Sequence, residues 1–189
     1  MNFLFSRLIS PVMVTLSLCA APLTGWTADV EFGQIASQTN PVTTSLSKNM
    51  TLGIQVYFNK VNANGGVLGN KLILTTLDDG LQAPKMLELT RQLIDKQSIV
   101  GLIGFINSAG LAEIARQDLP KKNDIALIAP LQGDKHIVGS TNIFPLRSSY
   151  TDEVTFLLKE AKKWEKDTLA IVNINIAFFF SLHGACNHI

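Results

Sequence analysis

Residues 65–80 read GGVLGNKLILTTLDDG, and this stretch decides the fold of the chain. The glycine pair that opens it ends a helix, because glycine adopts the left-handed backbone conformation without steric cost. A short turn follows, and an apolar strand from Lys71 to Leu77 then leads to two adjacent aspartates, Asp78 and Asp79. A helix, a turn and a strand in this order predict one unit of an alternating α/β chain.

The alternation continues on both sides of this stretch. The helix before the glycine pair is predicted from Thr44 to Ala63, because apolar residues recur there every three or four positions: Leu46, Met50, Ile54, Tyr57, Phe58 and Val61. Another helix opens at Pro84, where a first turn does not need the missing N–H, and buries Met86, Leu87, Leu89, Leu93 and Ile94. Two more are predicted at Gly110–Lys121 and Thr151–Lys166.

The predicted strands are short apolar runs between these helices: Val30–Ala36, Lys71–Leu77, Ile99–Phe105, Ile125–Ala129, Ile143–Leu146 and Leu169–Val172. The third of them is apolar throughout, so we expect it to be covered on both faces. Strands separated by helices of this length imply right-handed crossovers. The sequence therefore predicts a doubly wound, parallel α/β sheet.

Composition limits the class of protein. Hydrophobic residues make up 47% of the chain and charged residues 16%, which is typical of an ordered globular protein. A length of 189 residues suits one domain or one lobe of a larger protein. The formal net charge is only +1, so the basic surface that a nucleic acid partner requires is missing and this class of function is excluded.

The first 28 residues have the pattern of an export signal. Arg7 precedes a short apolar run, Leu8–Leu18, and small residues lead to a cleavage point after Ala28. The run is too short to span a bilayer comfortably. The alternative to an export signal is a buried first helix. We expect a periplasmic or secreted protein, with lipidation at Cys19 as the less favoured outcome because the surrounding match to a lipoprotein site is partial. With only Cys186 beyond the signal, the mature chain has no disulfide framework.

Ligands of parallel α/β sheets bind outside the carboxyl ends of the strands, where loops meet helix N-termini. Three loops are therefore candidates: Ser37–Asn40, Ile106–Gly110 and Pro130–Asp134. Asn107 or Ser108 is expected to cap the next helix, whose first N–H groups then suit a carboxylate or another anion. A plain helix cap without a ligand is the alternative for Ser108.

Residue patterns that carry catalysis or hold a cofactor are absent or weak. Asp78 and Asp79 are neighbours along a strand and point to opposite faces, so a turn role is favoured over an acid–base or metal pair. The histidines lack the spacing of metal ligands. The GLIG sequence of residues 101–104 lies within a strand and does not open a helix, unlike a dinucleotide fingerprint. We therefore expect no enzyme activity, no cofactor and no metal site.

Five segments carry a family resemblance when taken in order: FGQIA (32–36), NKVNANGGVLGNKLILTTLDDG (59–80), LIGFINSAG (102–110), IALIAP (125–130) and NIFPLRSSYTDE (142–153). Over residues 29–172 they resemble the periplasmic substrate-binding proteins of branched-chain amino acid ABC transporters, the leucine/isoleucine/valine-binding type. The resemblance implies a type I Venus flytrap, in which two α/β lobes enclose a ligand. It further implies an amino acid or amide ligand, a membrane permease as partner and no cofactor.

The resemblance also implies a division of the chain and a set of ligand contacts. Residues 29–145 correspond to the N-terminal lobe, and residues 146–173 to the hinge crossing and the start of the second lobe. Contacts to the ligand carboxylate and ammonium are implied for the two loops after the third and fourth strands, namely Asn107, Ser108, Ala109, Gly110, Ala129, Leu131 and Gln132. Leu131 and Gln132 stand where relatives often have small or hydroxyl residues, which leaves the ligand open. Tyr150 resembles an aromatic residue that closes over the ligand, with a packing role as the alternative.

Residues 174–189 depart from the family pattern. Their apolar run around Phe178–Phe180 has no amphipathic period, and the chain ends where relatives continue. We interpret this segment as the product of a frameshift or a premature stop, with a genuine one-lobe protein as the alternative. Because affinity in a flytrap comes from enclosure between lobes, we expect weak binding or none.

Two other classes of function stay open at this point. One is the ligand-sensing domain of a receptor or regulator with the same fold. The other is a small exported hydrolase or reductase, for which no nucleophile or cofactor loop is found in the sequence.

Overall fold

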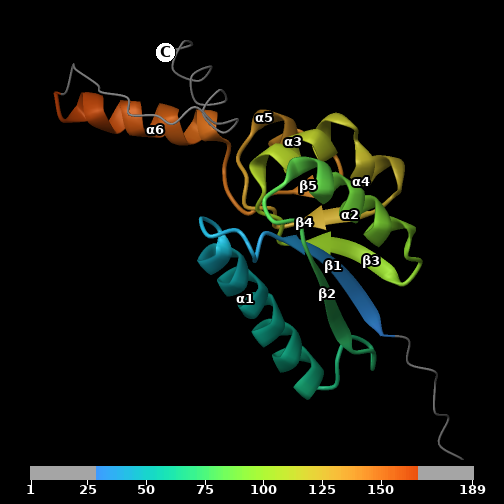
Figure 1. Ribbon diagram of the computed structural model, residues 1–189. Helices are drawn as coiled ribbons and strands as arrows, with labels where there is room; N and C mark the ends of the chain where they lie inside the picture. The colour runs from blue at the N-terminus through green and yellow to red at the C-terminus, as the bar shows by residue number, and fades with distance from the viewer. Residues whose placement is uncertain (1–28, 166–189) are drawn as a thin grey trace, which may run out of the picture.

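The computed structural model describes residues 29–165, and these form a five-stranded, wholly parallel sheet with helices around it (Figure 1). The strand order is β2-β1-β3-β4-β5, and all neighbouring strands are parallel. The connection from β2 to β3 crosses β1, whereas the other connections lead to the adjacent strand. The elements in chain order are β1 (Val30–Ala36), α1 (Thr44–Ala63), β2 (Leu72–Asp78), α2 (Ala83–Asp95), β3 (Ile99–Ile103), α3 (Ser108–Arg116), α4 (Leu119–Lys122), β4 (Ala126–Ile128), α5 (Lys135–Val138), β5 (Ile143–Phe144) and α6 (Tyr150–Lys163). The predicted fold class is confirmed.

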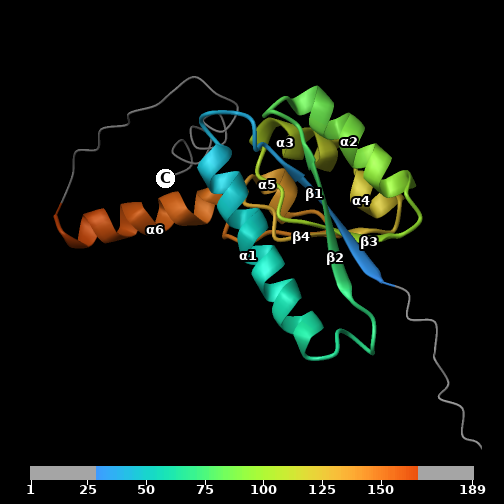
Figure 2. The same ribbon diagram turned by 60° about the horizontal axis from the view of Figure 1, so that its bottom comes forward.

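Most of the core lies on one face of the sheet, under α2, α3, α4 and α5 (Figures 1 and 2). Leu102, Leu127 and Ile143 are register partners on three neighbouring strands and form a buried row on this face. The helices contribute Met86, Leu93, Leu111, Ile114, Leu119 and Ile137 to the same core. Alternating side chains of β3, β4 and β5 therefore point into this layer, and their neighbours point to the other face.

The glycines between α1 and β2 end the helix as predicted. Gly65 and Gly66 both have positive φ, at 95° and 73°, and the Gly66 N–H donates to the Val61 carbonyl. A Cβ on Gly66 would collide with the carbonyl oxygen of Asn70. Only glycine fits this turn, because an L side chain meets both the strained backbone and the steric overlap.

Two helix predictions need correction. The helix predicted at Gly110–Lys121 is divided into α3 and α4, because Asp118 takes a left-handed backbone (φ 55°) and Pro120 has no N–H to continue the ladder. The short helix α5 was not predicted. It begins where the Asp134 side chain accepts a hydrogen bond from the His136 N–H at 2.8 Å. Strand boundaries moved by a few residues; β3, for example, ends at Ile103 instead of Phe105.

The expectation that β3 is covered on both faces is only partly confirmed: Ile99, Gly101 and Leu102 are buried and Ile103 is partly buried, but exposed apolar residues lie on and beside this strand. Val100 and Phe144 are each 55% exposed, and Ile128 is also exposed. Ile103, Ile128 and Phe144 are register partners and form a row on the face opposite to the buried one. We call Ile103, Ile128 and Phe144 the open row. In the part of the chain that the structure describes, α1 is the helix on this face, and it packs over β1 and β2 through Phe58.

The predicted apolar stripe of α1 is only partly buried. Phe58 is buried, its ring centroid 5.5 Å from that of Phe32, whereas Leu46 and Tyr57 are exposed. Met50 and Ile54 lie close to Gly104 at the end of β3. The flank of α1 that carries Leu46 and Tyr57 therefore has no packing partner among residues 29–165.

The last described helix, α6, extends away from the sheet (Figure 1). Its first residue is anchored, since the Tyr150 N–H donates to the Gly133 carbonyl at 2.9 Å. Beyond this point the apolar residues Phe156, Leu157 and Trp164 are exposed. The helix was predicted, but the apolar face expected for it has no partner in the described part of the chain.

None of the helices within residues 29–165 combines the length and the apolar character that a membrane-spanning segment needs.

Candidate functional site

The carboxyl ends of β1, β2 and β3 meet around a buried carboxylate. Asp79 follows β2 and is 0% exposed. Its Oδ1 accepts a hydrogen bond from the Ser37 hydroxyl, which follows β1, at 2.6 Å. Its Oδ2 accepts one from the Asn107 side-chain amide, which follows β3, at 2.7 Å. Three loops that are distant in sequence are thus tied together at one edge of the sheet.

The neighbouring aspartate has a separate role. Asp78 accepts from the N–H groups of Gln38 and Gly80, at 2.9 and 3.0 Å. Burial by itself would raise the pKa of Asp78, but hydrogen bonds from Thr39 and from these N–H groups outweigh it, so the pKa lies below its usual value. The predicted turn role of the two aspartates is confirmed, since Asp79 likewise accepts from the Leu81 N–H at 2.9 Å.

The loop after β3 leads into α3, and Asn107 is its N-cap. The Asn107 Oδ1 accepts from the Gly110 N–H at 3.1 Å, so this N–H is used within the protein. The N–H groups of Ser108 and Ala109 lie in the first turn, where a helix leaves N–H groups without intrahelical partners. Ser108 is half-buried and Ala109 exposed, so both are reachable from solvent. Asn107 rather than Ser108 is therefore the cap, and the Ser108 hydroxyl is not needed for that role.

Gly110 has a packing role. A Cβ at this position would lie 2.9 Å from Cβ and 3.0 Å from Cγ of Met86, and closer still to its sulfur. Because α3 approaches α2 this closely, the first turn of α3 is held near the carboxyl edge of the sheet. The glycine thus positions the loop, while its N–H is already bonded to Asn107.

The loop after β4 is fixed by backbone hydrogen bonds. Ala129 has a left-handed backbone (φ 54°), and its N–H donates to the Phe144 carbonyl at 2.8 Å. The Leu131 N–H donates to the Phe105 carbonyl at 2.9 Å, which joins this loop to the one before α3. Both N–H groups are therefore occupied within the protein.

Gln132 and Tyr150 contact each other. Both side chains are buried, and the Tyr150 hydroxyl donates to Gln132 Oε1. The Gly133 N–H donates to the same oxygen at 3.2 Å. Burial raises the pKa of Tyr150 above its usual value. In this structure Tyr150 packs against the loop after β4, which agrees with the packing alternative considered for it.

The RSSYTDE segment (residues 147–153) forms the N-terminal cap and the first turn of α6. Ser149 is the N-cap of α6 and accepts from the Asp152 N–H at 3.0 Å. Arg147 forms an ion pair with Glu153, and this contact holds the pKa of Glu153 below its usual range. The Arg147 guanidinium also lies 4.9 Å from the centre of the Tyr150 ring. These contacts orient α6 where the chain leaves the sheet.

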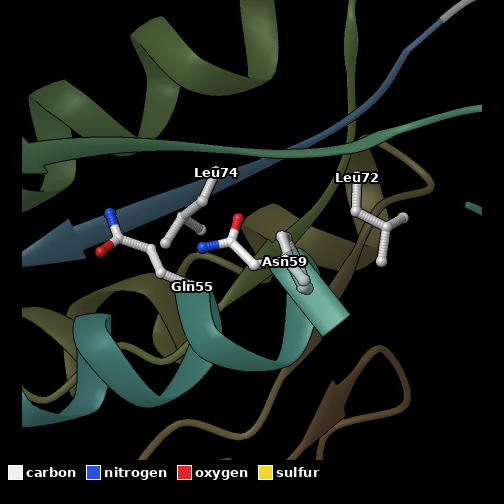
Figure 3. Close-up of a pocket in the computed structure, with 5 residues that line it drawn as sticks. Gln55, Asn59, Leu72 and Leu74 are labelled. Atoms are coloured by element: carbon white, nitrogen blue, oxygen red, sulfur yellow. The ribbon is translucent and has the colours of Figure 1, made fainter. Parts of the chain in front are cut away.

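A separate groove of about 270 Å³ lies between α1 and β2 (Figure 3). Figure 3 shows Gln55 and Asn59 of α1 next to Leu72 and Leu74 of β2. Leu72 begins β2, so the groove lies away from the carboxyl edge. It shares no residue with the candidate site. Among the described residues, no group of three or more His, Cys, Asp or Glu side chains is arranged to hold a metal ion.

Sequence reasoning missed the link between Ser37, Asp79 and Asn107. The available signal was weak: each is a small polar residue just after a predicted strand, and parallel strands bring such residues to one edge. The candidate residues themselves are divided. Asn107, Ser108, Ala109 and Gly110 form the first turn of α3 and its cap, whereas Gln132 and Tyr150 face each other. Ala129 and Leu131 contribute to the joining of the loops.

A family model described as "Periplasmic binding protein" matches residues 29–186, which is most of the chain. The chain belongs to the periplasmic binding protein family. The resemblance inferred from the sequence is therefore confirmed. No curated protein matches the chain. Members of this family are substrate-binding proteins and not enzymes.

Solved structures with the same fold include an extracellular ligand-binding receptor from Verminephrobacter eiseniae, with a TM-score of 0.78 and 21% identity. A fatty acid ABC transporter substrate-binding protein from Thermomonospora curvata has a TM-score of 0.74 and 17% identity. An ABC transporter substrate-binding protein from Desulfitobacterium hafniense, in complex with Leu, has a TM-score of 0.69 and 18% identity. Each match covers 85% of this chain. The chain spans only 45%, 41% and 46% of these proteins, respectively.

Proposed function

We propose that the chain is part of the extracytoplasmic solute-binding component of an ABC importer, and that it takes the carboxylate end of an amino acid or a similar small polar ligand. Family membership supports this role, and proteins of the same fold include ABC transporter substrate-binding proteins. An export signal at residues 1–28 and a membrane permease as partner are parts of the same proposal. Residues 1–28 and 166–189 lie outside the described residues.

The first turn of α3 is the observation that carries the proposal. The N–H groups of Ser108 and Ala109 lack intrahelical partners, and the Ser108 hydroxyl is close to them in the chain. N–H groups at a helix N-terminus carry a partial positive charge that favours an anion. The leucine and the fatty acid named for two proteins of this fold both have a carboxylate, so this group is their shared chemistry.

The other candidate residues have supporting parts in this proposal. Asn107 and Gly110 hold the first turn of α3, and Ala129 and Leu131 hold the adjacent loop beside it. Gln132 and Tyr150 join that loop to the start of α6. In this proposal residues 29–145 are the first lobe, and α6 begins the second lobe after the hinge crossing at about residue 146.

Affinity is expected to be low in this chain. A carboxylate on the α3 turn keeps much of its surface in water, so each hydrogen bond to it competes with hydration. Enclosure by a second lobe would remove that competition. We expect a dissociation constant of about 1 mM or weaker for the 189-residue chain.

Titration with L-leucine, followed by NMR amide by amide, tests the proposal. The expected result is a saturable shift of the Ser108 and Ala109 amide signals, with little change at Leu72 in the distant groove. L-leucinamide is the matched control, because it lacks the carboxylate and should leave both signals in place. Ser108→Ala should weaken the L-leucine effect. Equal shifts with L-leucine and L-leucinamide, or none with either, would contradict a carboxylate site.

A further inference from the structure

The cap of the α3 turn, Asn107, is hydrogen-bonded to Asp79, a buried residue that does not reach the surface of the turn. Asp79 Oδ1 accepts from the Ser37 hydroxyl and the Leu81 N–H, and Oδ2 accepts from the Asn107 side-chain amide. Both oxygens are therefore occupied by donors. Asp79 is fully buried and Asn107 nearly so, which removes water as a substitute partner.

The Asn107 amide has a definite orientation because of this contact. Its Nδ2 donates to Asp79, which leaves Oδ1 to accept from the Gly110 N–H. If the amide were turned over, its oxygen would face the carboxylate and its NH₂ would face the Gly110 N–H. Two acceptors and two donors would then oppose each other. Asp79 thus selects the one orientation of Asn107 that caps α3.

We infer that Asp79 is a positioning residue of the ligand site and acts through Asn107 on the first turn of α3. The inference rests on the proposed function, because it concerns the N–H groups of Ser108 and Ala109 as ligand contacts. Asp79 holds these groups in place before a ligand arrives, so that binding does not have to order the turn. Because Ser37 and Leu81 bond the same carboxylate, the turn is also fixed relative to β1 and β2.

One substitution tests whether the second acceptor oxygen of Asp79 matters, apart from the size of the side chain. Asp79→Asn keeps the size of the side chain but offers only one acceptor oxygen. Its NH₂ must face either the Asn107 amide or the Leu81 N–H, and both are donors. Asn107→Asp places a second carboxylate against Asp79. The exchange variant, Asp79→Asn with Asn107→Asp, restores the pattern: the amide at position 79 donates to the carboxylate at position 107, whose other oxygen accepts from the Gly110 N–H.

The test compares wild type, the two single variants and the exchange variant in the full 189-residue chain. Amide hydrogen exchange is measured at Gly110 and, as a reference for global stability, at the core residue Ile35. Asp79→Asn should speed exchange at Gly110 by about tenfold relative to Ile35, and the exchange variant should return it close to the wild-type rate. The shifts that L-leucine causes in the Ser108 and Ala109 amide signals should likewise weaken in Asp79→Asn and recover in the exchange variant.

Ser37→Ala is the control on the same carboxylate. It removes the hydroxyl on Oδ1 and leaves the Asn107 contact on Oδ2, so Gly110 exchange should stay at the wild-type ratio to Ile35. If Asp79→Asn does not fold, Asn107→Asp tests the contact from the other partner. Its carboxylate can still accept from the Gly110 N–H but meets the Asp79 carboxylate as a second acceptor, so Gly110 should exchange faster relative to Ile35.

The outcomes separate the two proposals. Equal acceleration at Gly110 and Ile35, or no recovery in the exchange variant, means that Asp79 only stabilises the fold and overturns the positioning role. No L-leucine shift in wild type overturns the proposed function, while exchange at Gly110 still decides whether Asp79 controls the turn.

Discussion

The hydroxyl of Tyr150, at the start of α6, donates a hydrogen bond to the side-chain oxygen of Gln132, in the loop after β4. Both residues are buried, at 3% and 2% exposure. The contact joins the last described helix to the loop beside the candidate ligand site. A displacement of α6 would therefore also displace that loop or break this hydrogen bond.

The two tyrosines of the chain form a matched pair for testing this contact. Tyr150→Phe leaves Gln132 Oε1 with one donor fewer in a buried position and should lower the free energy of unfolding by about 1–2 kcal/mol. Tyr57→Phe should have almost no effect, because Tyr57 is 63% exposed. Urea unfolding curves give both values. Equal effects would show that Tyr150 is not bonded as described.

Gly110→Ala tests the close approach of α3 to α2. A methyl group there overlaps Met86, so we expect a loss of about 2 kcal/mol or more and a disturbed first turn of α3. Gly53→Ala is the matched control within α1, where a Cβ meets no atom within 4 Å. It should stabilise the protein by about 0.5–1 kcal/mol, because alanine favours a helix over glycine. Thermal unfolding of both variants distinguishes packing from helix propensity.

Leu127 and Ile128 are neighbours on opposite faces of β4. Leu127 is fully buried under the helices, so Leu127→Ala should cost about 2–5 kcal/mol. Ile128 belongs to the open row, and Ile128→Ala should cost less than about 1 kcal/mol. Chemical denaturation measures both. A large cost for Ile128→Ala would mean that some other part of the polypeptide covers the open row.

Ser47 has a buried hydroxyl without a hydrogen-bond partner among the described residues. Ser47→Ala should therefore raise the free energy of unfolding by about 1 kcal/mol. Thr51, one turn further along α1, donates to Gln34 Oε1 at 2.9 Å. Thr51→Val is the contrasting variant and should lower stability by about 1–3 kcal/mol, because it removes a partner from buried Gln34. Destabilisation by Ser47→Ala would indicate a bound water at that hydroxyl.

Glu31 makes a contribution to folding stability that is lost at low pH. Hydrogen bonds from Lys96, Ser98 and Thr75 lower the pKa of Glu31 from 4.5 to about 2. A carboxyl whose pKa is lower in the folded state stabilises the fold above its unfolded pKa and loses this effect as the pH falls. The loss should occur between pH 4.5 and about 2.

Unfolding by urea at pH 6 and pH 3 measures the contribution of Glu31. Its size should be about 1–2 kcal/mol, because solvent screens the exposed Lys96 ammonium. Glu31→Gln should reduce the difference in stability between the two pH values, and Lys96→Gln should reduce it in the same direction. An unchanged difference in both variants would show that other carboxyl groups cause it.

Much of the fold was predictable because it depends on local pattern. The apolar period of α1, the glycines that end it and the proline that opens α2 are each read from adjacent residues. The cap of α3 was likewise predictable, since Asn107 is a polar residue shortly before the apolar period of the helix. The break between α3 and α4 at Asp118 was missed, although Pro120 within the predicted helix is itself a local signal against one continuous helix.

The sequence by itself determined the order of helices and strands, the parallel sheet and the loops at its carboxyl edge, because period and turn chemistry act over a few neighbouring residues. Only the tertiary structure decided which side chains share a hydrogen bond and which apolar faces are buried. Asp79 and Asn107 are 28 positions apart, and Gln132 and Tyr150 are 18 apart. Their contacts depend on how crossovers bring strand ends together. Ile128 and Phe144 of the open row stay exposed because no helix within residues 29–165 packs over them, a fact that apolar sequence alone does not reveal.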